Sequence, residues 1–185
     1  MENQNQVNEV VQENNESRTG NAKQIMKDIL SFALTACAIV VLCQVVLALH
    51  IVPSSSMEPT IKTNSFAVCW RLPFFFDDPA PEHGDIVSFK SDERGKILIK
   101  RVIGLPGDEI SFRDGYVYRN GDKIYEPYVA EEGTTYADQT YTVPEGHIFV
   151  LGDNRMHSTD SRRLDNPYIS FHDLYAKMLF AIPLP

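Results

Sequence analysis

The sequence lacks the short patterns that identify many hydrolases and metalloproteins. It contains no G-x-S-x-G, S-x-x-K, H-E-x-x-H or C-x-x-C motif, each of which sets a nucleophile, a base or metal ligands at a fixed spacing. The histidines have no metal-ligand spacing, and no local pattern singles one out for a Ser-His-Asp triad. We therefore predict that the protein holds no metal and uses no cofactor.

Cysteine and positive charge are also scarce. Two of the three cysteines, Cys37 and Cys43, fall within one apolar run, which leaves Cys69 alone and implies no disulfide framework. The chain has 17 Lys and Arg residues against 25 Asp and Glu residues, a formal net charge of −8. Nucleic-acid-binding proteins normally carry a basic face, so we predict no nucleic-acid partner.

The N-terminal part divides into a polar and an apolar segment. Residues 1–28 are rich in Asn, Gln and Glu and contain no aromatic residue, a composition that cannot form a packed core, and we predict a disordered tail. Residues 29–49 contain no charged residue. About 20 apolar residues span the hydrocarbon core of a membrane, so we predict one transmembrane helix there.

A cleaved signal peptide is the alternative interpretation of the apolar run. Its apolar region would be about 7–15 residues long and followed by small residues, whereas this run is longer and His50 follows it. We therefore expect a retained anchor. Arg18, Lys23 and Lys27 precede the run, and the next basic residue is Lys62. Because Lys and Arg flank the cytoplasmic end, we predict a single-pass protein of the cell membrane with a cytoplasmic N-terminus.

Residues 50–185 are predicted to form one extracytoplasmic, mostly-β domain. Short segments rich in β-forming residues recur along them, separated by turn residues. Asp114-Gly115 and Asn120-Gly121 are favourable pairs for hairpin turns. The expected strands are residues 65–70, 85–90, 96–105, 109–112, 116–125, 146–154 and 177–182.

Lys100 is a candidate catalytic base within the expected strand 96–105. Alternate residues share one face of a strand, which places Lys100 between Leu98 and Val102. Apolar neighbours favour the neutral amine, and a lysine pKa lowered from about 10.4 toward neutrality suits a general base. From the strand pattern alone, a structural role is the favoured interpretation. In that role, Lys100 lies on an edge strand and its side chain extends until the amine reaches water.

The segment PSSSMEPT, residues 53–60, follows the apolar run closely. Pro53 and Pro59 restrict the backbone, and Met57 can fill an irregular apolar gap. The segment can therefore be a shaped loop that holds serine hydroxyls in fixed positions. A polar linker beside the membrane is an equally good interpretation of these residues alone.

Four segments, in order, resemble the type I signal peptidase family. SSSMEPT comes after the apolar run, and GDIVSFK, KRVIGLPGD and GDNRMHSTDSR follow it, so that the resemblance covers nearly all of residues 30–180. Members are bacterial, membrane-anchored Ser/Lys endopeptidases of the S26 type with an irregular β domain. The resemblance implies a monomer that cleaves signal peptides from exported precursor proteins through an acyl-enzyme, in contact with membrane lipid.

The resemblance also implies the catalytic residues. The nucleophile would be Ser56, which directly precedes the methionine of the first motif, and the general base would be Lys100. The oxyanion would be bound by the Ser56 backbone N–H and by the hydroxyl of Ser54. An inactive β domain that binds a partner, and a self-cleaving Ser/Lys regulator of the SOS-repressor type, are the alternatives. Residues 1–28 cannot supply the DNA-binding helices of the second.

The last motif carries the implied supporting residues. Ser158 would orient the lysine amine, and Asp160 and Arg162 would brace the site. The family usually has Asp-Asn where this chain has Met156 and His157. This difference puts the geometry of the loop that carries Ser158 in doubt, but it does not change Ser56 or Lys100. His157 as a base in its own right is the less favoured interpretation.

The loop LPFFF, residues 72–76, carries three successive aromatic residues. They cannot all point inward from an extended segment. Either two cover the core and one is exposed, or the loop enters the membrane interface near the site, since a contiguous apolar patch often marks a contact surface.

Overall fold

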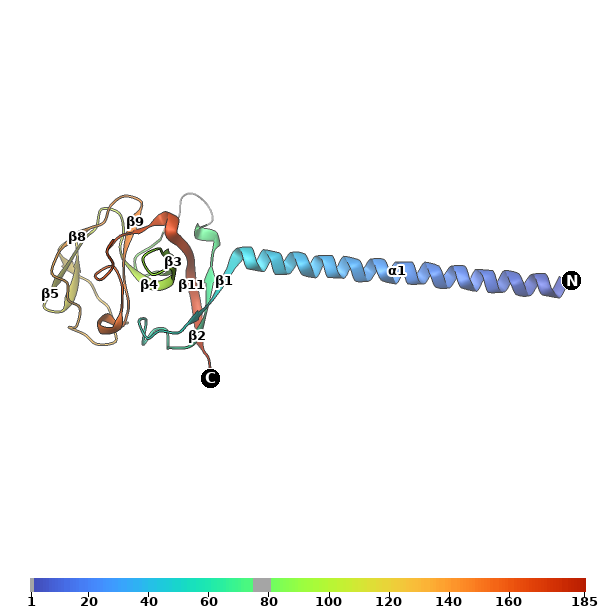
Figure 1. Cartoon of the computed structure of the whole chain (residues 1–185), viewed down its shortest axis with the longest axis horizontal. Coiled ribbons are helices and arrows are strands. Elements are labelled where there is room, and N and C mark those ends of the chain that lie inside the picture. The colour runs from blue at the N-terminus through green and yellow to red at the C-terminus, as the bar shows by residue number, and fades with distance from the viewer. Residues whose placement is uncertain (1, 75–80) are drawn as a thin grey trace. The chain divides into compact units, whose positions relative to one another are not determined.

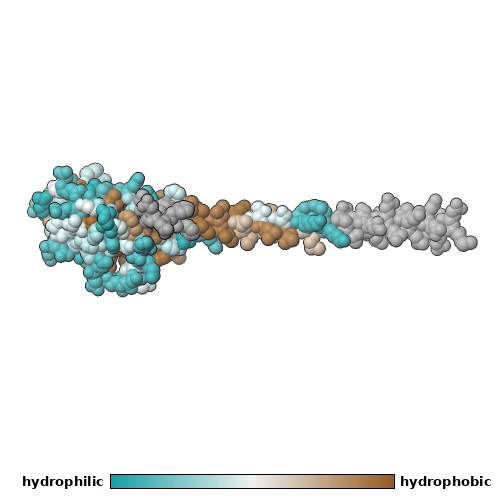
Figure 2. Space-filling model, turned by 90° about the horizontal axis from the view of Figure 1, so that it is seen from above, coloured by the Kyte–Doolittle hydropathy of each residue, from teal (hydrophilic) through white to brown (hydrophobic). Residues whose placement is uncertain are grey.

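A computed structural model describes residues 2–74 and 81–185, with the side chains of residues 23–72, 74 and 81–185. The chain divides into two compact units, Met1–Gln44 and Val45–Pro185. Residues 2–44 of the first unit form most of the helix α1 (Glu2–Val46) (Figure 1). Within it, Lys23–Val46 is long and apolar enough to cross a membrane, and Figure 2 shows apolar side chains over much of this stretch. A helix that exposes apolar residues on all sides suits a lipid environment better than water.

The N-terminal boundaries differ from the predicted ones at two places. Residues 2–28, predicted to be disordered, are helical in the structure. Their Glu, Gln and Lys residues form helices readily, and a helix that continues from an apolar segment needs no separate nucleation. The predicted helix end at Leu49 is wrong by three residues, because Leu47 begins a strand that pairs with residues 65–70.

Seven antiparallel strands form the larger sheet, in the order β1-β2-β11-β3-β4-β9-β10. Their bounds are β1 Leu47–Val52, β2 Ser65–Trp70, β3 Ile86–Ser91, β4 Lys96–Gly104, β9 His147–Leu151, β10 Ile169–Ser170 and β11 Leu174–Pro183. Strand β4 therefore lies between β3 and β9, inside the sheet and not at its edge. Lys100, the predicted general base, therefore lies on an interior strand of the sheet.

A second sheet has the order β7-β6-β5-β8. Its strands are β5 Glu109–Arg113, β6 Tyr116–Arg119, β7 Asp122–Lys123 and β8 Tyr141–Thr142, and short 3-10 turns lie at η1 Leu72–Phe74, η2 Arg155–His157 and η3 Phe171–Asp173. The two predicted hairpin turns are confirmed. Asp114 and Gly115 have φ of 51° and 80°, and Asn120 and Gly121 have 55° and 91°, the positive values that a type I′ turn requires at both central residues.

The mostly-β prediction is confirmed, and three strands were not predicted. Strand β1 was hidden because its first residues continue the apolar run of the helix. Strands β8 and β10 are two residues long, too short to show an alternating pattern. The predicted strand over residues 116–125 is broken by the turn at Asn120 into β6 and β7.

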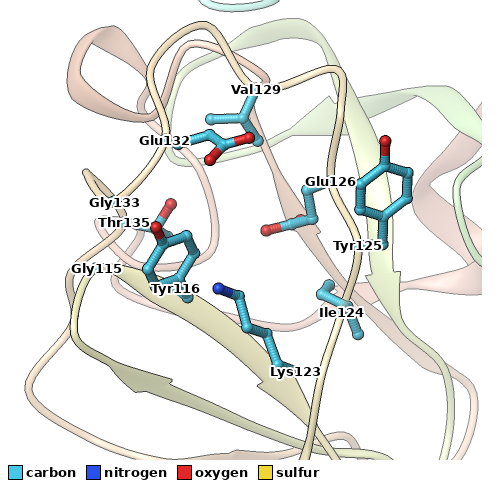
Figure 3. Close-up of a pocket in the computed structure, with 10 residues that line it drawn as sticks. All are labelled: Gly115, Tyr116, Lys123, Ile124, Tyr125, Glu126, Val129, Glu132, Gly133 and Thr135. Carbon is cyan, nitrogen blue, oxygen red and sulfur yellow. The ribbon is translucent and has the colours of Figure 1, made fainter.

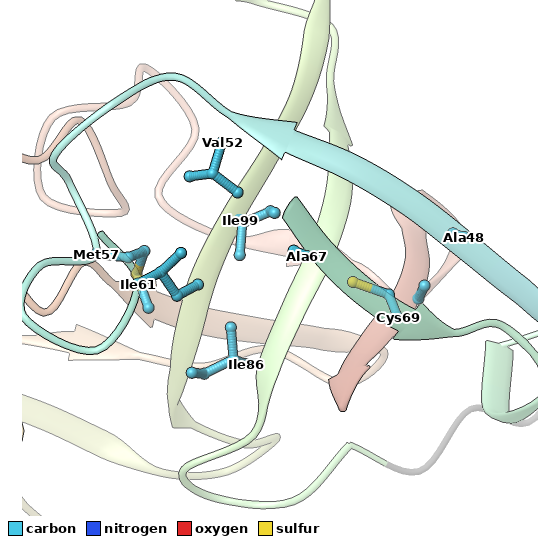
Figure 4. Packing of buried hydrophobic residues seen from close by; sticks show 9 residues of the cluster. Ala48, Val52, Met57, Ile61, Ala67, Cys69, Ile86 and Ile99 are labelled. Carbon is cyan, nitrogen blue, oxygen red and sulfur yellow. The ribbon is translucent and has the colours of Figure 1, made fainter. Parts of the chain in front are cut away.

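Three clusters of buried apolar residues form the core of the β unit. The one nearest the proposed site consists of Ala48, Val52, Met57, Ile61, Ala67, Cys69, Ile86, Ile99 and Ala176 (Figure 4). In a second cluster, Phe74 packs partly buried against residues that include Val87 and Phe89. Phe75 and Phe76, to which the aromatic-loop hypothesis also refers, lie outside the described residues.

Candidate active site

The segment Pro53–Thr60 is a shaped loop between β1 and β2, not a linker. Met57 and Ile61 are fully buried in the first core cluster, and Figure 4 shows their side chains next to each other. The Ile61 N–H donates to the Met57 carbonyl at 2.8 Å, and the Glu58 N–H donates to the Ser55 carbonyl at 3.0 Å. Burial of Met57 therefore anchors the loop at the residue next to Ser56.

The three serines have different environments. Ser54 is exposed, Ser55 is half-buried, and Ser56 is 7% exposed. The hydroxyl oxygens of Ser54 and Ser56 lie 3.3 Å apart. The Ser56 carbonyl accepts a hydrogen bond from the N–H of Asn154 at 3.1 Å, which ties the serine loop to the loop that follows β9.

The amine of Lys100 contacts the Ser56 hydroxyl. Lys100 is 3% exposed, and its Nζ donates to Ser56 Oγ at 2.8 Å and to the Ile99 carbonyl at 2.7 Å. The interpretation in which this side chain reaches water along a sheet edge is therefore wrong, because β4 is an interior strand and the amine is buried.

Burial also changes the acidity of Lys100. Desolvation lowers the pKa of its amine from 10.5 to about 8; the carboxylates of Asp160 and Asp153 act in the opposite direction, and the charge of Lys96 acts with burial. A lysine with this pKa holds a useful fraction of neutral amine near neutrality, as a general base requires. A base within hydrogen-bond reach of a hydroxyl is the arrangement that activates a serine nucleophile.

The dyad opens into a cleft of about 150 Å³. Its lining residues are Ser54, Ser56, Arg94, Lys96, Leu98, Lys100, His157 and Thr159. His157 thus lies at the cleft, but the amine that contacts Ser56 belongs to Lys100. Met156 and His157 fall in the short turn η2, where Met156 is half exposed, and the departure from the family motif leaves the dyad contact intact.

Asp160 and Arg162 form a buried ion pair. Asp160 is fully buried and accepts hydrogen bonds from Arg162 Nε at 2.9 Å and from the Gly152 N–H at 2.9 Å. Burial alone would raise the pKa of Asp160, but the Arg162 guanidinium and the Gly152 N–H outweigh it and lower that pKa. The carboxylate is therefore charged, and Arg162 in turn donates to the Arg155 carbonyl at 2.8 Å.

Ser158 is fully buried close to the dyad. A side chain at Gly152 would come within 2.2 Å of Ser158 Oγ and 2.5 Å of the Ser56 carbonyl oxygen, so only glycine fits between these two serines. The Ser158 hydroxyl lies near the Asp160 carboxylate and helps to lower the pKa of that group. The implied orientation of the Lys100 amine by Ser158 stays a prediction.

Two further buried ion pairs support the loop after β9, and the sequence did not predict them. Arg101 donates to both oxygens of Asp153, at 2.8 and 2.6 Å, and its guanidinium lies 3.8 Å from the Tyr128 ring centre. Arg155 pairs with Glu126 at 2.6 Å. The partners of these ion pairs are 52 and 29 residues apart in the chain, so no local sequence pattern indicates the pairing. Arg101 and Asp153 do lie within the quoted motifs.

A separate cavity of about 200 Å³ lies beside Glu126. Figure 3 shows the Lys123 amine and the carboxylates of Glu126 and Glu132 around it. Its one lysine, Lys123, lies over the Tyr116 ring at 3.1 Å, and none of its lining residues is a serine or a cysteine. The contact between the Lys100 amine and the Ser56 hydroxyl lies at the other cleft, so the catalytic candidate is the cleft at Ser56. Among residues 2–74 and 81–185, no group of three or more His, Cys, Asp or Glu side chains could hold a metal ion.

Comparison with known proteins agrees with these observations. A family model described as signal peptidase, peptidase S26, matches residues 25–182. A probable signal peptidase I-2 of Synechocystis sp. is 40% identical over 116 residues, which cover 60% of this chain and 52% of that protein. Signal peptidase I U of Bacillus subtilis is 35% identical over 147 residues, 72% of this chain and 75% of that protein.

Two other relatives extend the comparison. Signal peptidase I of Bacillus caldolyticus is 32% identical over 161 residues, 80% of this chain and 85% of that protein. A crystal structure of a signal peptidase I from Enterococcus faecalis V583 is 36% identical, with a TM-score of 0.48, and covers 53% of this chain and 96% of that chain. The matched region spans 52% and 59% of the length of two Synechocystis relatives. The chain belongs to the signal peptidase family, peptidase S26.

Proposed function

We propose that this protein is a membrane-anchored serine endopeptidase that removes signal peptides from exported precursor proteins by a Ser56/Lys100 dyad. The observation that carries the proposal is the 2.8 Å hydrogen bond between the buried Lys100 amine and the Ser56 hydroxyl. The family to which the chain belongs supports the same reaction.

The reaction begins when neutral Lys100 takes the proton from Ser56 Oγ, and the oxygen attacks the scissile carbonyl carbon. The Ser56 N–H and the Ser54 hydroxyl donate to the developing oxyanion, where preorganised donors act most strongly. The Lys100 ammonium then protonates the departing amine. Water activated by the neutral amine hydrolyses the acyl-enzyme on Ser56 and restores the dyad.

Cleavage of a defined precursor tests this function. Full-length enzyme in detergent is incubated with a precursor that carries an Ala-x-Ala site, and the products are mapped by mass spectrometry. We expect one cut, directly after the second alanine. Absence of cleavage, or cuts scattered along the precursor, would contradict the proposal.

The pH dependence of cleavage reports the state of Lys100. We expect kcat/KM to rise with pH through a pKa of about 8 and to level off above it, because only the neutral amine accepts the serine proton. At pH 6 the value should be about a hundred-fold below the plateau, since two units below a pKa leave about 1% of the base form. Initial rates from pH 6 to 10 at constant ionic strength measure this.

Two controls make the pH profile informative. Circular dichroism at each pH checks that the enzyme stays folded, and a precursor without titratable residues near the cut removes substrate effects. A flat profile, or a rate that falls between pH 7 and 9, would rule out Lys100 as the base.

Ser54 is expected to contribute to transition-state binding. Ser54→Ala should lower kcat by about 10²–10³-fold with a smaller effect on KM, as removal of one oxyanion donor typically does. Ser54→Thr, which keeps a hydroxyl, should retain more activity than Ser54→Ala, and Ser55→Ala should leave kcat unchanged. An unaltered rate in Ser54→Ala would assign the donor elsewhere.

The placement in the cell follows from the first unit. We propose that Lys23–Val46 is retained as a single anchor with its N-terminal end in the cytoplasm. Residues 47–185 lie outside, in contact with lipid and precursor, and the protein acts as a monomer. The apolar stretch and the basic residues before it support this placement. Protease added to intact cells should degrade the β unit; protection of that unit would reverse the orientation.

A further inference from the structure

The cleft at the dyad has a charge opposite to that of the whole chain. Its lining residues include Arg94 and Lys96 besides Lys100, together with His157, and no carboxylate. The chain as a whole has a formal net charge of −8. A cleft lined by one sign of charge attracts ligand groups of the other sign.

Lys96 lies on the same side of β4 as the catalytic amine. Alternate residues share a strand face, and Lys96, Leu98 and Lys100 all line the cleft. At about 3.3 Å per strand residue, Lys96 is roughly 13 Å from Lys100. If the scissile carbonyl is at Ser56, an extended substrate that follows β4 places a residue three to five positions from the cut beside Lys96.

The charge on Lys96 is free to act on a substrate. Lys96 is exposed, and none of the ion pairs found in residues 2–74 and 81–185 involves it. Lys90, an exposed lysine on the neighbouring strand β3, contacts Asp92 at 2.8 Å instead. Arg94 is only loosely paired, with its Nε 3.5 Å from Glu93 Oε1.

We propose that Arg94 and Lys96 make this peptidase prefer precursors that carry a carboxylate three to five residues from the scissile bond. The inference rests on the proposed endopeptidase function. A substrate carboxylate there gains attraction from both side chains, whereas a Lys or Arg there is repelled, and such charge matching discriminates between partners. Any requirement for small side chains at the cut itself is independent of this preference.

A series of matched precursors tests the preference. Each carries the same Ala-x-Ala site, with Glu, Gln or Lys at the fourth residue before the cut or at the fourth after it, and is cleaved by full-length enzyme in detergent. On one of the two sides we expect kcat/KM to fall by roughly two- to five-fold from Glu to Gln and again from Gln to Lys, the size of exposed charge interactions. The difference should shrink in about 1 M salt, where the screening length is near 3 Å.

Three enzyme variants separate this effect from others. Lys96→Gln should reduce the Glu-to-Lys ratio, Lys96→Glu should invert it, and the matched control Lys90→Gln should leave it unchanged. Lys96→Gln also removes a charge that lowers the pKa of Lys100, but that change affects all precursors equally and cancels in the ratio.

The outcomes distinguish the inference from the function on which it rests. Equal cleavage of the Glu, Gln and Lys precursors on both sides, or an unchanged ratio in Lys96→Gln, would overturn the charge preference and leave the peptidase intact. If wild-type enzyme cleaves no member of the series, the proposed function fails and the inference fails with it.

Discussion

Replacing Ser56 by Ala, or Lys100 by Met, is expected to reduce precursor cleavage by at least about 10³-fold in kcat. Each change removes one half of the 2.8 Å contact between the nucleophile and its base. The two residues act as a unit, so the double variant should be hardly worse than either single variant. Single-turnover assays with an Ala-x-Ala precursor measure the loss.

The matched controls are the neighbouring serine and a lysine outside the cleft. Ser55→Ala and Lys90→Met remove the same groups without touching the dyad, and both should cleave at the wild-type rate. Circular dichroism and thermal melting in detergent show whether each variant is folded. Normal cleavage by either Ser56→Ala or Lys100→Met would exclude the dyad.

Lys100→Met should also be at least as stable as the wild type. Burial lowers the pKa of Lys100 to about 8, against 10.5 when the group is exposed. Below pH 8 the amine is protonated in both the folded and the unfolded state, so the whole penalty for burying the ammonium, about 3 kcal/mol, is present. It disappears as the pH rises from 8 to 10.5. The site thus lowers stability at pH 7 in return for a usable base, as functional sites often do.

The features that the sequence predicted correctly are local ones. Alternating β-forming segments marked most strands, and the Asp-Gly and Asn-Gly pairs marked both type I′ turns, because turn geometry depends on the residues at the turn itself. The apolar position of Met57 was likewise visible within one short segment. The meeting of Ser56 with Lys100 followed from resemblance alone, since 44 residues separate them.

Long-range pairing explains what the sequence could not predict. Whether Lys100 is exposed or buried depends on β9, which pairs with one edge of β4. The residues of β9 come about 50 positions later in the chain. The pairing of Arg101 with Asp153 depends on the same contact. Strand β1 was missed because it continues the apolar run of the helix. Within a continuous apolar run, the sequence pattern does not show at which residue a helix ends and a strand begins.

These contacts place three buried ion pairs around a single loop. Asp153, Arg155, Asp160 and Arg162 all come from the residues that follow β9, and their partners lie within the loop, on β4 and before β8. The loop also holds Gly152, which packs against the Ser56 carbonyl. Rigid support of this kind keeps the serine and the lysine within reach of each other, so damage to one pair should affect both stability and catalysis.

Asp160→Asn is accordingly expected to give the largest loss of stability, about 3–5 kcal/mol of unfolding free energy. The substitution keeps the shape of the side chain but leaves Arg162, whose side chain is 5% exposed, as a buried charge without its counter-ion. Urea unfolding of full-length protein in detergent, followed by circular dichroism, measures the change. Asp165→Asn, at an exposed carboxylate of the same loop, is the matched control and should change stability little.

Two further measurements distinguish an electrostatic role of Asp160 from simple damage to the fold. The Asp160 carboxylate raises the pKa of Lys100, so in Asp160→Asn the midpoint of the kcat/KM profile should move to lower pH. The double variant Asp160→Asn with Arg162→Met removes both charges and should recover part of the lost stability, because an unpaired buried charge costs more than an absent pair. A stability within 1 kcal/mol of wild type for the single variant, or an unmoved pH midpoint, would mean that this ion pair does not support the dyad in the way its geometry indicates.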